Sequence, residues 1–392
     1  MEATKKLYER DSYRKEFEAS VERCVRDGEH WNIVLDQTGF FPEGGGQGAD
    51  QGRLGEAGVL DVQIRDGIIC HICDSPLEEG QTVKGRICWK QRFSNMQQHT
   101  GEHIVSGIAH RTFGVNNVGF HLGSQDVTLD FDRLLEEEQI RWLEERANEA
   151  VWANHRVEVS YPDEKILQKL EYRSKIDIED QVRIVTIEDV DVCACCAPHV
   201  NNTGEIGLIK VTGWQKYKGG VRIHILCGDR ALAAVCRDQR QISGISGMLS
   251  VRPETVAEGV AHLQNECREA KYRVIELQTE RMMDQILHLP QEQKNVCLFV
   301  SQLDVPVMRK AVNAMQEKHP GYCGIFVGNE DAGYRYLIVS RTLDSRKMGE
   351  TLKQRFTCRG GGKADMIQGQ ITGRREEIER VFSSIEQENT AE

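Results

Sequence analysis

The segment QQHTGEHIVSGIAH, residues 97–110, decides how the middle of the chain folds. Ile104 and Ile108 follow helical spacing, so the segment is predicted to form a helix. His99 and His103 then lie one turn apart on the same helical face. A rigid helix presents two imidazoles to one metal ion at this spacing, although histidine pairs of this kind also occur as ordinary surface or partly buried residues.

A second set of metal-binding residue types stands in CACCAPHV, residues 193–200. The proline excludes helix for the residue before it, so the chain is predicted to leave the strand QVRIVTIEDVDV and enter a loop. Cys195 and His199 supply a thiolate and a third imidazole, which zinc prefers and which Mg²⁺ and Ca²⁺ do not. Cys193 and Cys196 are interpreted as small buried thiols.

One zinc ion is therefore predicted to be held by four residues from the two segments: His99, His103, Cys195 and His199. A closed set of four protein ligands normally marks a structural zinc, so the ligand count leaves a structural and a catalytic site open. Glu102 invites comparison with HExxH peptidases, but it precedes the second histidine, and we expect its side chain to point away from both. CHIC at residues 70–73 is interpreted as strand packing.

Length and composition indicate a globular protein with more than one domain, since 392 residues exceed one ordinary core. A net charge of −11 argues against an indiscriminate nucleic-acid binder, so any RNA contact must be confined to patches. One basic run extends over residues 335–375, and a solvated surface is its alternative interpretation. The thirteen scattered cysteines and the absence of an export signal or an apolar span predict a reducing cytoplasm and no membrane partner.

The order of strand-like and helix-like segments along the sequence predicts an α+β multidomain protein with four parts. We expect a β-rich, β-barrel-like domain over residues 1–88 and an α+β zinc-containing domain over 89–231. A helical or coiled-coil linker is expected over 232–288, either as a long helix or as an antiparallel helical hairpin. A small α/β domain is expected over 289–392.

Four segments carry a specific resemblance. FFPEGGGQGADQG (40–52), QQHTGEHIVSGIAH and CACCAPHV, in this order and spacing, resemble the editing half of alanyl-tRNA synthetase and its freestanding relatives, the AlaX proteins. FTCRGGGKADMIQGQITG (356–373) is similar to the Gly-rich signature of the synthetase's C-terminal domain. The resemblance covers nearly the whole chain and implies the long form of AlaX. No aminoacylation domain fits ahead of residue 30, so we expect an ATP-independent enzyme.

The resemblance implies a trans-editing hydrolase, an aminoacyl-tRNA deacylase, whose zinc pocket removes serine and also glycine from mischarged tRNA-Ala. It assigns substrate discrimination to the loop formed by Gly44, Gly45, Gly46 and Gln47, for which a flexible hairpin turn is the alternative. Where synthetases commonly have Gln-Lys-Gly-Ser, this chain has His121-Leu122-Gly123-Ser124. Where many have Cys-Gly-Gly-Thr-His, it has Cys-Cys-Ala-Pro-His, which makes the loop stiffer.

The catalytic residues are predicted to be His121, Ser124 and Thr128. His121 is a candidate proton acceptor or water holder, and Thr128 a sensor of the serine hydroxyl. The resemblance also implies tRNA binding by the C-terminal domain, through Arg355, Arg359, Gly360, Gly361, Gly362 and Lys363. Alternatives are a non-catalytic tRNA-binding protein with a structural zinc, a zinc hydrolase for another ester or amide, and an editor for another amino acid. Homodimer formation through the helical or C-terminal part is a further expectation.

Overall fold

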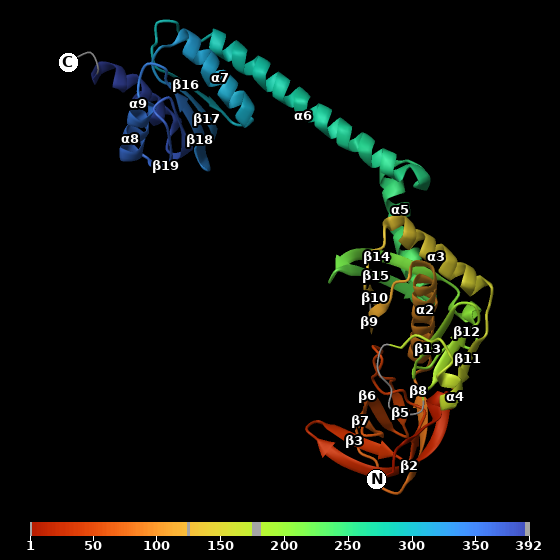
Figure 1. Ribbon diagram of the computed structural model, residues 1–392. Helices are drawn as coiled ribbons and strands as arrows, with labels where there is room; N and C mark the ends of the chain where they lie inside the picture. Colours follow the sequence, from red (N-terminus) through yellow and green to blue (C-terminus); the bar gives the residue numbers. More distant parts are fainter. Residues whose placement is uncertain (1, 124–125, 175–181, 389–392) are drawn as a thin grey trace. The chain divides into compact units, whose positions relative to one another are not determined.

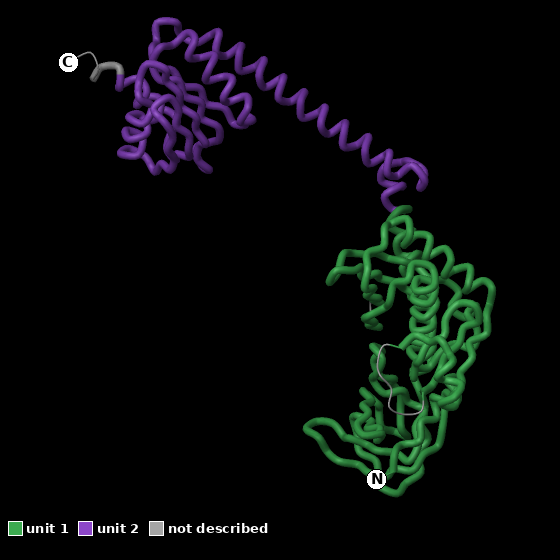
Figure 2. The backbone as a smooth tube through the Cα atoms, in the orientation of Figure 1, with its two compact units in different colours: residues 1–243 green, residues 244–392 purple. Residues whose placement is uncertain are grey.

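The computed structural model describes residues 2–123, 126–174 and 182–388. The chain divides into two compact units, residues 1–243 and 244–392 (Figure 2). Both units combine β-sheets with packed helices, which confirms the expected α+β class. The finer division into four domains stays a prediction. Along the described residues, no helix combines the length and the apolar character that crossing a bilayer requires.

The first unit begins with six strands that close into a barrel in the order β2-β3-β7-β6-β5-β8 (Figure 1). Phe17, Ala19 and Val21 of β2 are buried while the residues between them are more exposed, as the alternation of a barrel strand requires. The elements of this part are β1 (Lys5–Lys6), α1 (Leu7–Arg10), β2 (Glu16–Asp27), β3 (His30–Leu35), β4 (Gln37–Thr38), β5 (Gly52–Leu54), β6 (Ala57–Arg65), β7 (Ile68–Cys73) and β8 (Thr82–Ile87).

The rest of the first unit is built around the long helix α2 (Trp89–Phe113). Its two sheets have the orders β14-β15-β10-β9 and β11-β12-β13. Val127, Leu129 and Phe131 of β10 share one apolar core with α2 and α3. The further elements are β9 (Asn117–Leu122), β10 (Val127–Phe131), α3 (Glu137–Trp152), β11 (Val157–Ser160), α4 (Glu164–Leu167), β12 (Ile184–Ile187), β13 (Asp191–Ala194), a 3₁₀ turn (Thr203–Ile206), β14 (Ile209–Tyr217) and β15 (Gly220–Cys227).

A buried ion pair joins the barrel to α2. Arg92 and Asp50 are 0% and 1% exposed, and the Arg92 Nε donates to both Asp50 carboxylate oxygens at 3.1 and 3.0 Å. The guanidinium also donates to the carbonyls of Ser12 and Gly39, at 3.0 and 2.6 Å. Asp50 closes the Gly-rich segment and accepts from the Phe41 amide at 2.6 Å. The ion pair therefore fixes that segment to the first turn of the helix that carries the two histidines.

The second unit contains most of a helical segment and a five-stranded sheet with the order β16-β17-β18-β20-β19, in which β16 and β17 are the parallel pair. One face packs against α6 and α7, and the other against α8 and α9. The predicted helical segment is two helices, α5 (Gly228–Leu249), in which the unit boundary falls, and α6 (Val256–Leu287), with a 3₁₀ turn (Pro253–Thr255) before α6. The others are β16 (Val296–Val300), α7 (Val305–Lys318), β17 (Cys323–Asn329), β18 (Gly333–Val339), α8 (Ser345–Arg355), β19 (Thr357–Gly362), β20 (Met366–Thr372) and α9 (Arg375–Glu388).

Candidate metal centre

Four residues from the two predicted segments meet inside the first unit. His99 and His103 lie on α2, and Cys195 and His199 lie on the loop after β13, as predicted from the sequence. One potential ligand atom from each residue lies within 4.8 Å of those of the other three. The Cys195 Sγ is 3.5 Å from the His99 Nε2 and 3.4 Å from the His199 Nε2. Three imidazoles and one thiol around one point are a donor set that suits zinc.

The second ring nitrogen of each histidine is held by another residue. The Nδ1 of His99 is 2.9 Å from the Gln47 Oε1, that of His103 is 2.9 Å from an Asp191 carboxylate oxygen, and that of His199 is 3.1 Å from the Thr100 hydroxyl. Because these contacts fix the rings, the Nε2 atoms of His99 and His199 face the Cys195 sulfur. Partners of this kind orient the histidine ligands of metal sites and set their tautomers.

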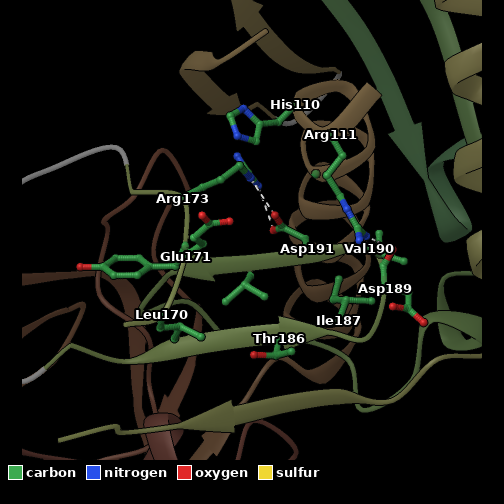
Figure 3. Close-up of a pocket in the computed structure, with 13 residues that line it drawn as sticks. His110, Arg111, Leu170, Glu171, Arg173, Thr186, Ile187, Asp189, Val190 and Asp191 are labelled. Carbon is green, nitrogen blue, oxygen red and sulfur yellow. Dashed lines mark hydrogen bonds and ion pairs between the residues drawn. The ribbon is translucent and has the colours of Figure 1, made fainter. Parts of the chain in front are cut away.

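Asp191 is itself held in place by Arg173. The Arg173 guanidinium donates to both of its carboxylate oxygens, at 2.7 and 2.8 Å. Burial opposes ionisation of Asp191, but His103 and Arg173 outweigh it and hold the pKa of the carboxyl below its ordinary value. A cavity of about 750 Å³ lies on this side, and Figure 3 shows Arg173 and Asp191 joined within it. An ionised carboxylate therefore accepts the hydrogen of the His103 Nδ1.

The charges of the cluster favour a thiolate. Burial opposes ionisation of Cys195, but the facing imidazoles of His99 and His199 outweigh it, and the pKa of the thiol lies well below its ordinary value. Burial lowers the pKa of His199 to about 3, so that this imidazole is neutral at physiological pH. A thiolate and a neutral imidazole are the protonation states in which Cys195 and His199 bind a metal ion. Burial opposes protonation of His103, but Cys193, Asp191 and Cys195 outweigh it and raise its pKa well above the ordinary value, so this imidazole must release a proton to a binding metal ion.

Glu102 corrects one expectation from the sequence. The prediction that its side chain points away from both histidines is wrong, because its Oε2 lies 3.8 Å from the His103 Nε2. The carboxylate is buried and accepts hydrogen bonds from the Ser106 hydroxyl and the Asn117 amide, both at 2.7 Å. α2 is buried on nearly all sides, so no solvent-facing side was left for this residue. A buried carboxyl group thus lies beside a ring nitrogen of the cluster.

The Gly-rich loop, Gly44 to Gln47, connects the barrel to the cluster. Its ends are joined by two backbone hydrogen bonds of 3.0 Å between Gly44 and Gln47, and Gly45 and Gly46 have positive φ angles of 58° and 81°. The Gly46 carbonyl accepts from the Leu122 amide of β9 at 2.7 Å. A Cβ on Gly46 would lie 2.4 Å from the Phe120 carbonyl oxygen. The hairpin turn that was the alternative interpretation of this segment is therefore present. It places the Gln47 side chain against the His99 ring.

His121 and Thr128 lie elsewhere. They are direct cross-strand partners in β9 and β10, and the residues that flank Thr128 face the core shared with α2. Because side chains alternate along a strand, Thr128 and His121 lie on the opposite face of the sheet. The structure does not bring them to the four-residue cluster. Ser124 lies outside the described residues.

The predicted tRNA-binding residues fall into two groups. Arg355 ends α8, whereas Arg359 and the three glycines form β19 and Lys363 follows it. Arg359 pairs with Gln370, which pairs in turn with Arg335, so these exposed side chains form a row across three strands. Gly361 is open to solvent: a Cβ there would have no heavy atom within 4 Å apart from its chain neighbours.

Comparisons with known proteins fit this architecture. Residues 182–224 match the family described as "Threonyl and Alanyl tRNA synthetase second additional domain", and residues 5–91 match "tRNA synthetases class II (A)". The alanine–tRNA ligase of Pyrococcus abyssi is 32% identical over 94% of this chain, which covers only 42% of the ligase. The alanyl-tRNA editing protein Aarsd1 of Rattus norvegicus is 27% identical over 98% of this chain and 99% of that protein. The Aarsd1 of Bos taurus is 31% identical over 66% of this chain and 62% of that protein.

Fold, ligand cluster and family matches together relate the first unit to the additional domain of threonyl- and alanyl-tRNA synthetases, and the second unit is also similar to part of alanine–tRNA ligases. Within that class, the chain is similar over nearly its whole length to proteins named alanyl-tRNA editing proteins.

Four residues that support the cluster were missed from the sequence. They are Gln47, Thr100, Asp191 and Arg173, and each contacts a residue far away in the chain or holds one that does. Only Gln47 and Thr100 belonged to recognised motifs, and neither motif indicated ligand support by these residues. Acidic residues near a histidine pair in sequence are a local signal, but Asp191 lies 88 residues from His103 and gave none.

Proposed function

We propose that this protein is a trans-editing hydrolase that deacylates mischarged tRNA-Ala, with seryl-tRNA-Ala as its main substrate and glycyl-tRNA-Ala as a second one. The observation that carries the proposal is the buried cluster of His99, His103, Cys195 and His199 in a chain that is similar to alanyl-tRNA editing proteins. Relatives named alanyl-tRNA editing proteins support the reaction class, and the second unit supplies a candidate surface for the tRNA.

The four residues fit zinc, because the donor set, the thiolate and the supported imidazoles are those of a zinc site. Zinc bound there would polarise a carbonyl or lower the pKa of a nearby water. The protein's own contribution is to orient the ester in a desolvated site. An aminoacyl ester is intrinsically labile, so orientation and a placed water suffice for useful rates.

We propose that Glu102 accepts the proton of the attacking water. Its carboxylate is buried beside His103, and Ser106 and Asn117 hold it in one orientation. Glu102→Gln keeps the shape and removes the carboxylate that would accept the proton. We expect this variant to retain zinc and to lose about 100-fold in deacylation rate. If Glu102→Gln keeps full activity and full zinc content, Glu102 is not the proton acceptor. The candidates from the sequence, His121, Ser124 and Thr128, stay predictions in either case.

We propose that the Gly-rich loop contributes to substrate discrimination through Gln47. Its Oε1 is engaged with His99, and among the described residues its buried amide nitrogen has no hydrogen-bond partner. A buried donor without a partner is costly, so a substrate oxygen would complete the site. A substrate that fills this position would be favoured over one that leaves it unpaired.

We propose that the exposed row Arg335, Gln370 and Arg359, with the open backbone at Gly361, binds the tRNA backbone. Arginines supply phosphate contacts and need no base specificity. Arg359→Ala should weaken binding and flatten its salt dependence. Gly361→Ala meets no protein atom, so a loss of affinity there would report close approach of the tRNA. Unchanged binding in both variants would contradict this assignment. Homodimer formation and residence in the cytoplasm also stay predictions.

The decisive experiment compares hydrolysis of Ser-tRNA-Ala and Ala-tRNA-Ala by the intact protein and by Cys195→Ala, with zinc assayed in each. Cys196→Ala is the matched control, because this exposed neighbour lies outside the cluster. We expect preferential serine release that disappears with the zinc in the first variant and persists in the second. If the zinc-loaded protein binds tRNA but cleaves neither ester, the four-ligand site is structural and the protein is a tRNA-binding protein.

A further inference from the structure

Arg183 is a buried arginine whose guanidinium is only partly bonded. It directly precedes β12 and is 5% exposed, and its Nη1 donates to the carbonyls of Cys195 and Ala197 at 2.7 and 3.1 Å. Its Nε and Nη2 are buried as well, and neither has a hydrogen-bond partner among the described residues. Buried donors without partners are costly, and those of a charged group more so. Arg183 therefore supports the loop that carries Cys195 and leaves two donors for another group.

The two unpaired nitrogens form the edge of the guanidinium that binds an anion at two points. Nε and Nη2 donate in nearly the same direction and match two oxygens of a carboxylate or a phosphate. Elsewhere in the first unit this edge holds an aspartate. Arg173 donates through it to Asp191 at 2.7 and 2.8 Å. Arg222 donates through it to Asp130 at 2.6 and 2.7 Å. The same edge of Arg183, here called the Arg183 fork, donates to no carboxylate in the described parts of the chain.

A cavity of about 610 Å³ lies beside the Arg183 fork. Ser160 of β11 pairs with Ile184 of β12, so Tyr161 and Arg183 are the next neighbours across the two strands. Burial raises the pKa of Tyr161 and the charge of Arg183 opposes that rise, which agrees with their proximity. Tyr161 lines the cavity, and so do Glu9, Arg10, Arg156 and His199. Because His199 belongs to the four-residue cluster, the cavity extends to the candidate metal centre.

Two cations beside this cavity have no acidic partner. The carboxylates that line it each pair with a cation: Glu9 with Lys6 at 3.4 Å, Asp11 with Arg14 at 3.8 Å and Glu158 with Arg156 at 3.5 Å. Arg10 also lines the cavity, is exposed and makes no ion pair within the ranges that the structure describes. Together with the Arg183 fork, it leaves positive charge for a ligand. An anion is therefore the class of ligand that this cavity favours.

We propose that the Arg183 fork and Arg10 bind a phosphate group of the acceptor end of tRNA, an inference that rests on the proposed deacylase function. The amino acid of an aminoacyl ester has no free carboxylate, so the anions that the substrate brings are the phosphates of its RNA. A phosphate matches the fork as an aspartate does and is held without reading a base. Held beside His199, it would fix the position of the ester relative to the cluster.

Tyr161 is the side chain that must move to admit the phosphate. The nitrogens of the fork are buried, whereas Tyr161 is 39% exposed, so its ring can turn toward solvent without opening the core. Its hydroxyl lies 3.5 Å from a Glu9 carboxylate oxygen, which is at the limit of a hydrogen bond, so turning the ring costs little. Tyr161→Ala should therefore expose the fork.

Calorimetric binding of two probes to the full-length protein tests the site: the trinucleotide CCA without an amino acid, and inorganic phosphate. We expect Arg10→Ala and Arg183→Lys each to weaken CCA binding about 10-fold, because each loses a hydrogen bond between charged groups. Lysine keeps the charge but lacks the fork. Tyr161→Ala should bind inorganic phosphate more tightly than the parent. Arg23→Ala, which removes an exposed cation of β2 outside the cavity, is the matched control and should bind both probes like the parent.

Unchanged CCA binding in Arg10→Ala, whose side chain lies outside the ligand loop, would overturn the inference even if Arg183→Lys disturbs that loop. A parent protein that binds inorganic phosphate but not CCA, or neither probe, would overturn it too. These readouts are separate from deacylation. If Ser-tRNA-Ala is cleaved but CCA binding is indifferent to both arginines, only this inference fails. If CCA binds through both arginines but no ester is cleaved, the proposed function fails and the phosphate site stands.

Discussion

Replacing Gln47 by leucine tests whether the Gly-rich loop controls the metal centre. The leucine side chain has a similar volume but cannot accept the hydrogen of the His99 Nδ1, which lies 2.9 Å from the Gln47 Oε1. Gln47 and His99 are 1% and 3% exposed, so water cannot easily replace the lost contact. A buried donor without a partner costs about 1–3 kcal/mol. The ring is then free to turn its Nε2 away from the cluster.

That cost predicts the size of the effect. Loss of a partner behind a histidine ligand lowers metal affinity about 10- to 100-fold, which corresponds to about 1.4–2.7 kcal/mol. We therefore expect the zinc affinity of Gln47→Leu, measured by competition with a chromogenic chelator, to fall by this factor. Gln47→Glu, whose carboxylate can accept the same hydrogen bond, should restore most of the affinity.

Gly44→Ala serves as the control within the same loop. A Cβ at Gly44 has ordinary spacing, with its nearest atom at 3.9 Å, so this variant should bind zinc like the parent. If Gln47→Leu binds zinc within threefold of the parent, Gln47 does not orient His99, and its contribution must be sought in the substrate alone.

Three further predictions concern the support of the site. Asp50→Asn leaves the buried Arg92 without its carboxylate and should lower the free energy of unfolding by about 3–5 kcal/mol in a denaturant titration. Burial lowers the pKa of His71 from 6.5 to about 4. Because the unfolded chain takes up the proton first, the free energy of unfolding should fall by about 3 kcal/mol between pH 6.5 and pH 4. Thermal unfolding against pH checks this, and His71→Gln should flatten the profile. Gly46→Ala would press on the Phe120 carbonyl and displace the loop, so zinc affinity should fall at least as far as in Gln47→Leu; an unchanged affinity would disprove the coupling.

Local spacing predicted the parts of the site that depend on one element. His99 and His103 belong to one helix, and the interval of four residues determines their common face. The loop position of Cys195 and His199 followed from the proline between them. That the two segments meet was an inference from ligand chemistry, and the structure brings them together.

Tertiary packing determines the side-chain orientations that residue spacing could not predict. Glu102 is next to His103 in the chain, and a simple helical projection directs adjacent side chains apart. Because α2 is enclosed on nearly all sides, the carboxylate instead joins a polar group with Ser106 and Asn117. His121 was expected at the site because its motif aligns with that of the synthetases, but which face of β9 meets α2 depends on strand pairing.

Through the contacts of Gln47, docking of the Gly-rich loop and binding of a metal ion are thermodynamically coupled. The same short loop gives its Gly46 carbonyl to the Leu122 amide and its Gln47 side chain to His99. Any change that displaces the loop also removes a partner of a ligand, and by linkage a bound metal must favour the docked loop by the same factor. Since the loop comes from the barrel and His99 from α2, the metal centre joins two parts of the unit that the buried Arg92–Asp50 pair already holds together. This coupling explains why a glycine-rich turn stands beside a zinc-type site: only a residue without a Cβ lets the backbone approach β9 closely enough to bring Gln47 within reach.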